Sequence, residues 1–363
     1  MTASHRPALG DASTSPGSAT LAAATWRERE RAHADRADAL TAEYRAAHAR
    51  GERHAIDDFL FTYYPVKPSV LRRWQPGVGV RLEDAVEWAG RRWYRSVAAG
   101  PSEADAAGST ASVSLAPELD AADSAASMAP TPKLDAADFA GSEAPSPELA
   151  GPADVPALPV EVDAAAFVAE RGDLIGRIED LLTAVLHREP RFACFGLHEW
   201  AMVYRDDEHR HPIPLRLGQA ATDAVVESHR ISCSHYDAFR FFTPPARPLN
   251  LLQPTRATQC ALDQAGCLHA NMDLLKWALK LGPLVPGELL LDAFTLAREI
   301  RWTDMQASPY DVSDFKVPAI AIETPTGKDE YVRRQRDYAA RAQPLRARLL
   351  DVIARARAAA AAS

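Results

Sequence analysis

The sequence predicts a mainly α-helical fold: a single multi-helix globular domain with at most a small β-sheet, interrupted by a disordered linker. Apolar residues recur at helical spacing along most of the chain, whereas runs rich in Val and Ile are short and few. Residues 99–162 are rich in Ala, Pro, Ser, Asp and Glu and hold few large apolar side chains. With 363 residues, of which 47% are hydrophobic, the chain can still form one large core.

The two ends of the chain and the linker are expected to lack fixed structure. Residues 1–25 show no periodic pattern, residues 99–162 bury too little apolar surface to offset their ordering entropy, and the Ala- and Arg-rich residues 356–363 should fray. The N-terminus lacks the layout of a signal peptide, and no apolar run approaches the roughly 18 residues of a membrane helix. We therefore expect a cytoplasmic protein with no membrane partner.

Residues 26–98 are expected to form the helical first part of the core. The predicted elements are a charged helix from Trp26 to Arg50, a short helix capped by Asp57 or Asp58 and ended by Pro65, a helical turn from Ser69 to Trp74, and a helix from Arg81 to Arg95. The aromatic residues of the second element, Tyr63 and Tyr64 among them, either pack in the core or reach a pocket.

Residues 163–355 are expected to form the helical main part of the domain. Apolar spacing predicts helices from Asp163 to His187, after Gly266, and from Pro286 to Ile300. Thr326 and Asp329 form a capping-box-like start for a last helix, which Pro344 should kink. The Val- and Ile-rich run from Thr222 to His235 predicts a strand, with residues 214–217 as its edge partner.

The stretch from Cys194 to Asp273 gathers the groups that could carry chemistry. It contains all four cysteines and more than half of the 11 histidines, interleaved with acids, arginines and aromatic residues. Such a mixture in a region that should also be buried is typical of a polar functional site. Cys194 and Cys260 have apolar neighbours, so we expect them to be small core residues.

Metal binding is one interpretation of this stretch. The donor pairs are His198 with Glu199, Cys233 with His235, and Cys267 with His269. However, the sequence has no CxxC pair and no HExxH motif, and the Cys-x-His pairs do not match a zinc-finger spacing. The expected site therefore contains no metal ion and no other cofactor.

A metal-free organic active site is the preferred interpretation. The expected catalytic residues are carboxylate bases and histidine proton shuttles, namely Asp237, Glu199, Asp273, His235 and His269. The expected substrate-binding residues are His198, Trp200, Tyr204, Tyr236, Arg240 and Asn271. Arg240 would hold an anionic group of the substrate while the aromatic rings stack on it. A structural interpretation stays open, in which Arg240 only pairs with Asp237.

The net charge of −8 is unevenly distributed. Residues 99–165 hold twelve acids and one lysine, a net charge of −11, so the rest of the chain carries −8 + 11 = +3. A nearly neutral folded part does not have the basic surface of a committed nucleic-acid binder, although a local basic patch would suffice for DNA contact.

Several segments carry a family resemblance: FLFTYY, LRRWQPGVGV, CFGLHEWAMVYR, CSHYDAFRFFTPPARPLN, GCLHANMDLLKWALKL and DMQASPYD. They resemble a family of actinobacterial proteins known as 3-methyladenine DNA glycosylases, over about residues 26–98 and 165–350. The resemblance implies DNA repair, with DNA as the partner and hydrolysis of the N-glycosidic bond of an alkylated purine. Such a cationic base needs an aromatic pocket, with a carboxylate such as Asp237 or Asp273 nearby. The alternatives are a non-DNA enzyme, metal-assisted or not, for a small polar substrate, and a non-catalytic interaction protein.

Overall fold

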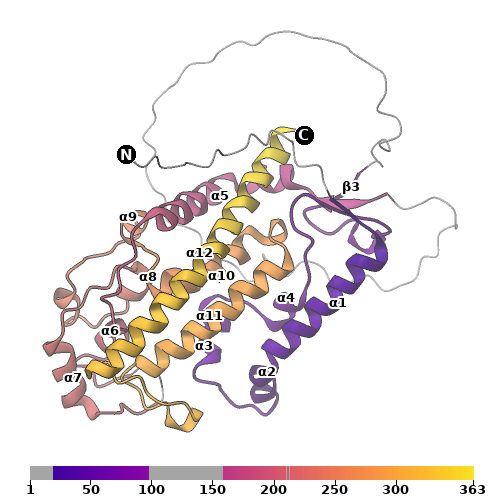
Figure 1. The fold of residues 1–363 in the computed structure, drawn as a ribbon. Coiled ribbons are helices and arrows are strands. Elements are labelled where there is room, and N and C mark those ends of the chain that lie inside the picture. Colours follow the sequence, from indigo (N-terminus) through magenta and orange to yellow (C-terminus); the bar gives the residue numbers. More distant parts are fainter. Residues whose placement is uncertain (1–18, 98–157, 210, 212) are drawn as a thin grey trace, which may run out of the picture.

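The computed structural model describes residues 19–97, 158–209, 211 and 213–363. Within these residues, helices packed side by side make up most of the protein and a small sheet lies at one end (Figure 1), which confirms the predicted fold class. Throughout the described ranges, no helix combines the length and the apolar character that a membrane span requires. The predictions for residues 1–18 and for residues 99–157 concern parts of the chain that lie outside these ranges.

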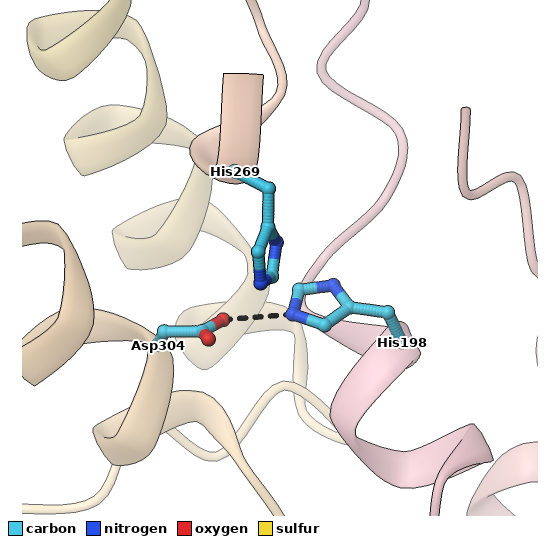
Figure 2. Close-up of side chains that lie close together, drawn as sticks. All are labelled: His198, His269 and Asp304. Carbon is cyan, nitrogen blue, oxygen red and sulfur yellow. Dashed lines mark hydrogen bonds and ion pairs between the residues drawn. The ribbon is translucent and has the colours of Figure 1, made fainter. Parts of the chain in front are cut away.

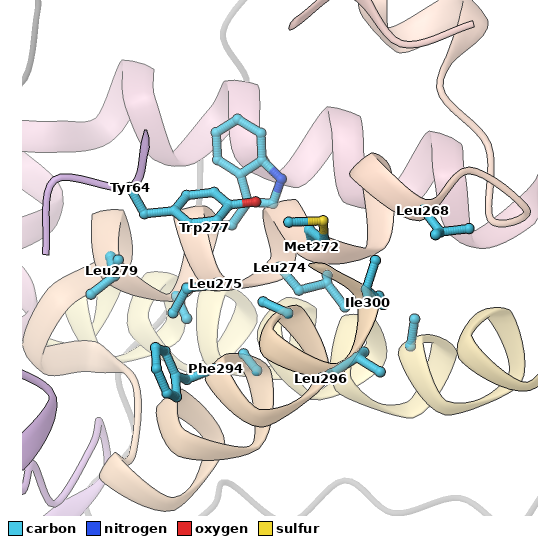
Figure 3. Close-up of a cluster of buried hydrophobic side chains, with 14 of the residues drawn as sticks. Tyr64, Leu268, Met272, Leu274, Leu275, Trp277, Leu279, Phe294, Leu296 and Ile300 are labelled. Atoms are coloured by element: carbon cyan, nitrogen blue, oxygen red, sulfur yellow. The ribbon is translucent and has the colours of Figure 1, made fainter. Parts of the chain in front are cut away.

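Four long helices form the body of the domain: α5 (Ala164–His187), α10 (Leu268–Leu281), α11 (Gly287–Ala307) and α12 (Pro325–Ala361). Helix α10 packs against α11, and α12 packs against α5, α10 and α11. Their apolar faces meet in the main core, where side chains of α10 such as Met272 and Leu275 lie beside Phe294 and Ile300 of α11 (Figure 3). The apolar residues that recur at helical spacing in the sequence are thus the residues that the helices bury.

The ends of these helices differ in part from the predicted ones. The Asp163 side chain caps α5 as an acceptor for the Ala166 amide. Helix α12 is capped by Thr324 rather than by the predicted Thr326, and it runs through Pro344 to Ala361. The expected fraying from residue 356 onward is therefore wrong for all but the last two residues, because the fully buried Ala356 keeps the final turns of α12 packed.

Helices α1 (Ala23–Leu40), α2 (Ala42–Ala49), α3 (Asp57–Tyr63) and α4 (Pro68–Arg72) form the first part. The predicted single helix from Trp26 to Arg50 is broken at Thr41, whose hydroxyl donates a hydrogen bond to the Ala37 carbonyl. The predicted cap of α3 is also wrong, because the buried Asp57 accepts hydrogen bonds from Arg298 and Trp302 of α11 instead.

The small sheet consists of β1 (Ala19–Leu21), β2 (Val80–Leu82), β3 (Tyr94–Ser96) and β4 (Val160–Val162), in the order β1-β2-β4-β3. The prediction of a helix over residues 81–95 is therefore wrong, as are those of disorder at residues 19–25 and 160–162. Strand β4 pairs antiparallel with both β2 and β3, although it follows them only after the linker. No local pattern reveals such distant partners. Trp88 lies in a buried turn between β2 and β3, against Trp26 and Trp74.

Short helices connect α5 to α10: α6 (Leu197–Ala201), α7 (Gly218–Ser228), α8 (Tyr236–Phe239) and α9 (Gln259–Leu262). The strand predicted for residues 222–235 is wrong, because Thr222, Val225 and Val226 are buried at helical spacing on α7. Its predicted edge partner forms only an isolated bridge from Leu215 to Tyr310. Single 3-10 turns lie at Val86–Trp88, Arg247–Leu249, Gly282–Leu284 and Ser313–Phe315.

Candidate active site

A cavity of about 300 Å³ lies beside α6, α10 and α12. Its lining includes groups that could carry chemistry, namely Cys194, His198, Cys233, Cys267, His269 and Tyr331, and further polar residues such as Arg188, Ser232 and Gln264. Leucines also line it, namely Leu251, Leu252, Leu262 and Leu268. An apolar pocket with a few convergent polar groups is the usual form of a small-molecule site, and this volume is at the lower end of such sites.

Three side chains at the cavity form a row of thiol, imidazole and carboxylate. The Cys194 sulfur lies 3.6 Å from Nδ1 of His198, and Nε2 of His198 donates a hydrogen bond of 2.9 Å to Oδ1 of Asp304. Figure 2 shows Asp304 and His198 joined by this bond, with the His269 ring beside them. His198 and Asp304 are 2% and 0% exposed, whereas Cys194 is partly exposed. A nucleophile, its base and a group that orients the base have this arrangement.

A tight turn brings Cys194 and His198 together. Phe195 and Gly196 both have positive φ, of 48° and 72°, and α6 begins at the next residue. Glycine suits the second position because a β-carbon there would lie 3.4 Å from the Ala307 side chain. The indole N–H of Trp200 donates to the Ala307 carbonyl and so holds α6 against the end of α11.

The carboxylate of Asp304 keeps His198 protonated. Burial lowers the pKa of His198, but the charge and hydrogen bond of Asp304, together with Cys194, bring it well above its ordinary value. Arg301 in turn holds Asp304, because its Nη1 lies 3.2 Å from Oδ2 of Asp304 and 2.9 Å from Oε1 of Glu199. Glu199, an expected catalytic residue, is therefore the buried ion-pair partner of Arg301.

The His269 ring lies close to two other buried imidazoles, those of His198 and His235. Its ring centroid is 4.6 Å from that of His198 and 5.5 Å from that of His235. Burial, and next the positive charge of His198, lower the pKa of His269 well below its ordinary value. The ring is thus neutral near pH 7, and it lines the cavity without a hydrogen bond to any described residue.

A second polar cluster lies behind His269. Nδ1 of His235 lies 3.0 Å from Oδ1 of Asp263, and its Nε2 lies 3.7 Å from Oδ2 of Asp273. The Lys276 ammonium lies 2.8 Å from Asp237 and 2.9 Å from Asp273. Burial raises the pKa of Asp237, but Lys276 and the other cations nearby together bring it below its ordinary value, so this carboxylate is charged at all ordinary pH values.

Among the described residues, two groups of buried side chains have potential metal-ligand atoms within 4.8 Å of one another: His198, His269 and Asp304, and His235, Asp237 and Asp273. Neither group matches the donor pairs predicted from the sequence. In the second group the Lys276 ammonium lies between the two carboxylates, where a cation would bind. In the first group a direct hydrogen bond joins His198 to Asp304, so we assign no metal to either group.

The predicted site residues are brought together only in part. His235, Asp237, His269 and Asp273, which were predicted to converge in one pocket, lie near one another, but of these four only His269 lines the cavity. Arg240 lies 3.3 Å from Asp237, as the structural interpretation predicts.

Most of the predicted binding residues have partners elsewhere. The Tyr204 hydroxyl donates to Glu227, and the Asn271 side chain accepts a hydrogen bond from Arg346. The Tyr236 ring lies under the guanidinium of Arg256. Of the predicted binding residues, therefore, only His198 lines the cavity.

The sequence interpretation missed Cys194, Asp304 and Tyr331. Cys194 is not a core residue, and the other cysteine expected in the core, Cys260, is exposed. Asp304 lies on α11 beyond Ile300, where that helix was predicted to end. The Cys-x-x-x-His spacing of Cys194 and His198 is the signal that could have shown the thiol–imidazole pair.

Comparison with known proteins gives no relative: no protein-family model, no curated protein and no solved structure matches the chain. The geometry of the cavity is therefore the basis for assigning a function.

Proposed function

We propose that the protein is a cysteine-dependent enzyme that hydrolyses or transfers the acyl group of a small carbonyl compound. Cys194 is the nucleophile, His198 is its base, and Asp304 orients and charges His198. The observation that supports this proposal is the row from thiol to imidazole to carboxylate that opens on a cavity of about 300 Å³.

The charge state of the row suits covalent catalysis. A protonated His198 next to Cys194 favours a thiolate–imidazolium pair, and the thiolate is the reactive form of cysteine. In the first step the thiolate attacks the carbonyl carbon, and the imidazolium gives its proton to the leaving group. In the second step His198 removes a proton from water or from an acceptor alcohol or amine, which releases the acyl group from the sulfur.

The cavity limits the size of the substrate. Four leucines and Ala261 are among the residues that line the cavity, so we expect the acyl group to be small and apolar. Leu251 is half exposed and lies at the mouth together with the exposed Arg191. A substrate that carries a negative charge on its leaving group would gain a contact there.

Selective alkylation by iodoacetamide tests the proposal. Cys260 is the internal control, because it is more exposed than Cys194 and has no histidine bonded to its sulfur among the described residues. At pH 6, peptide mapping should show that Cys194 reacts at least ten times faster than Cys260, because an ordinary thiol with a pKa near 8.5 is protonated there. Replacing His198 by Gln should abolish the preference.

A panel of p-nitrophenyl esters then tests the reaction itself. The wild type should show a burst of p-nitrophenol and an acetylated Cys194 in the intact mass, both absent from Cys194→Ala. Equal alkylation of Cys194 and Cys260 at pH 6, with no ester cleavage above that of Cys194→Ala, contradicts the proposal.

The DNA glycosylase implied by the family resemblance is the second candidate. The observation that favours it is the pair of exposed arginines over Asp237, since Arg240 and Arg256 could contact phosphates. The aromatic faces nearby already carry cations, because Arg256 lies over Tyr236 and Lys276 over Trp277. A cationic alkylated purine would compete with these side chains for the rings.

Base release from alkylated DNA distinguishes the two candidates. A glycosylase that uses Asp237 should release 3-methyladenine at low salt, lose about two orders of magnitude of activity in Asp237→Asn, and keep it in Cys194→Ala. A wild-type protein that releases no base at low salt excludes this candidate.

A further inference from the structure

The hydroxyl of Tyr331 belongs to a buried side chain that lines the cavity. Tyr331 lies on α12, is 1% exposed and lines the cavity. Among the described residues, its hydroxyl makes no hydrogen bond. Buried hydroxyls are normally paired, so an unpaired one at a cavity marks the place of a ligand atom. Tyr338, two turns later on the same helix, shows the ordinary case, because its hydroxyl bonds to Thr303 and to the Glu299 carbonyl.

The Tyr331 ring packs against the turn that carries the nucleophile. A β-carbon placed on Gly196 would lie 3.3 Å from the ring and 3.6 Å from the ring carbon that bears the hydroxyl. Gly196 lies between Cys194 and His198, so the hydroxyl is close to the point of attack. Burial, and next the charge of the Cys194 thiolate, raise the pKa of Tyr331 well above its ordinary value. The phenol therefore keeps its proton and acts as a donor.

We propose that Tyr331 donates a hydrogen bond to the carbonyl oxygen of the substrate when Cys194 attacks. This inference rests on the proposed function. The thiolate forms a bond to the carbonyl carbon, and the electron pair of the C=O π-bond moves onto oxygen, where the Tyr331 hydroxyl stabilises the negative charge. The pair then returns, the bond to the leaving group breaks, and a thioester remains. The ligand class is therefore an ester, thioester or amide.

Two reactions of the same thiol test this role. Acylation by p-nitrophenyl acetate passes through an oxyanion, whereas alkylation by iodoacetamide displaces iodide and forms none. In a Cys260→Ser background, Tyr331→Phe should slow acylation of Cys194 about 100-fold, the effect of removing one oxyanion donor. It should leave the alkylation rate within about two-fold. Because the hydroxyl has no partner to lose, the variant should also keep its melting temperature.

Tyr338→Phe is the matched control and should change neither rate. If Tyr331→Phe slows both reactions equally, the residue only positions the turn, and the inference fails while the proposed function stands. If it slows neither, the inference fails in the same way. If the wild type is acylated no faster than Cys194→Ala, the proposed function fails and this inference fails with it.

Discussion

At the scale of one residue, Lys276 stabilises two buried carboxylates by pairing with both of them. Its ammonium lies within 3 Å of both Asp237 and Asp273, and its side chain is 19% exposed. Lys276→Met should cost about 3 kcal/mol in the free energy of unfolding at pH 7, because two buried carboxylates lose their common partner. Lys280→Met, one turn later on α10, is the control, since Lys280 has no acidic partner within the described part of the chain. Urea unfolding measures both.

The loss of stability in Lys276→Met should depend on pH. In the wild type, Lys276 holds the pKa of Asp237 below its unfolded value, so the stability it contributes is lost as pH falls through the folded pKa. In Lys276→Met, Asp237 keeps only the exposed Arg240 and Arg256 as ion-pair partners, so its pKa rises relative to the wild type and protonation at low pH relieves the loss. The difference between wild type and variant should therefore shrink from pH 7 to pH 4.5. A difference that grows on acidification contradicts this account.

At the same scale, the sequence identifies some of the site and hides the rest. The histidines and acids on α10 and in the segment before it were predicted to cluster, because many such residues occur close together in the sequence. Cys194 was taken for a core residue, since its neighbours Phe195 and Leu197 are apolar. The Cys-x-x-x-His spacing hints at its pairing with His198, but the pairing also depends on two positive φ angles in the turn between them. Asp304 comes from a helix more than 100 positions later, where only folding brings it to His198.

Strand β4 is the element that holds the sheet together. Glu161 at its centre pairs with Arg81 of β2 and Arg95 of β3, each at 2.9 Å, and is almost fully buried. Glu161→Gln should cost about 1–2 kcal/mol in the free energy of unfolding, because both arginines lose a charged acceptor. Glu170→Gln, which breaks an exposed pair with Arg92, should cost about 0.5 kcal/mol or less. Equal effects in urea unfolding would count against a structural role for β4.

Elements that show a sequence pattern within their own residues were predicted. Elements that depend on pairing with distant residues were not. Helices α5 and α10 carry an apolar face that repeats within each turn, so the sequence alone indicates them. Strand β4 has three residues, and its partners lie on the other side of the linker. Helix α7 was taken for a strand because Val225, Val226 and Ile231 have high β-propensity, which burial against the core overrides.

At the scale of the whole molecule, the chain enters and leaves the linker at neighbouring positions of the sheet. The Val97 amide donates a hydrogen bond of 2.8 Å to the Pro159 carbonyl, and β3 and β4 run antiparallel on either side of it. Val97 and Pro159, which flank the segment from 98 to 157, are thus neighbours. A short chain can therefore close the gap without moving either end.

Replacing residues 101–156 by a Gly/Ser bridge of about six residues should consequently preserve the fold. The deletion must stop before Leu158, because β4 is part of the buried core. From the sequence, these residues had been assigned to the linker. Closing a shorter loop costs less entropy, so the free energy of unfolding should stay equal or rise by about 1–2 kcal/mol. The rate of Cys194 alkylation at pH 6 should not change, since the described residues that line the cavity come from positions 188–331. A loss of more than about 2 kcal/mol, or a slower Cys194, would show that the segment contributes to the folded core or to the site.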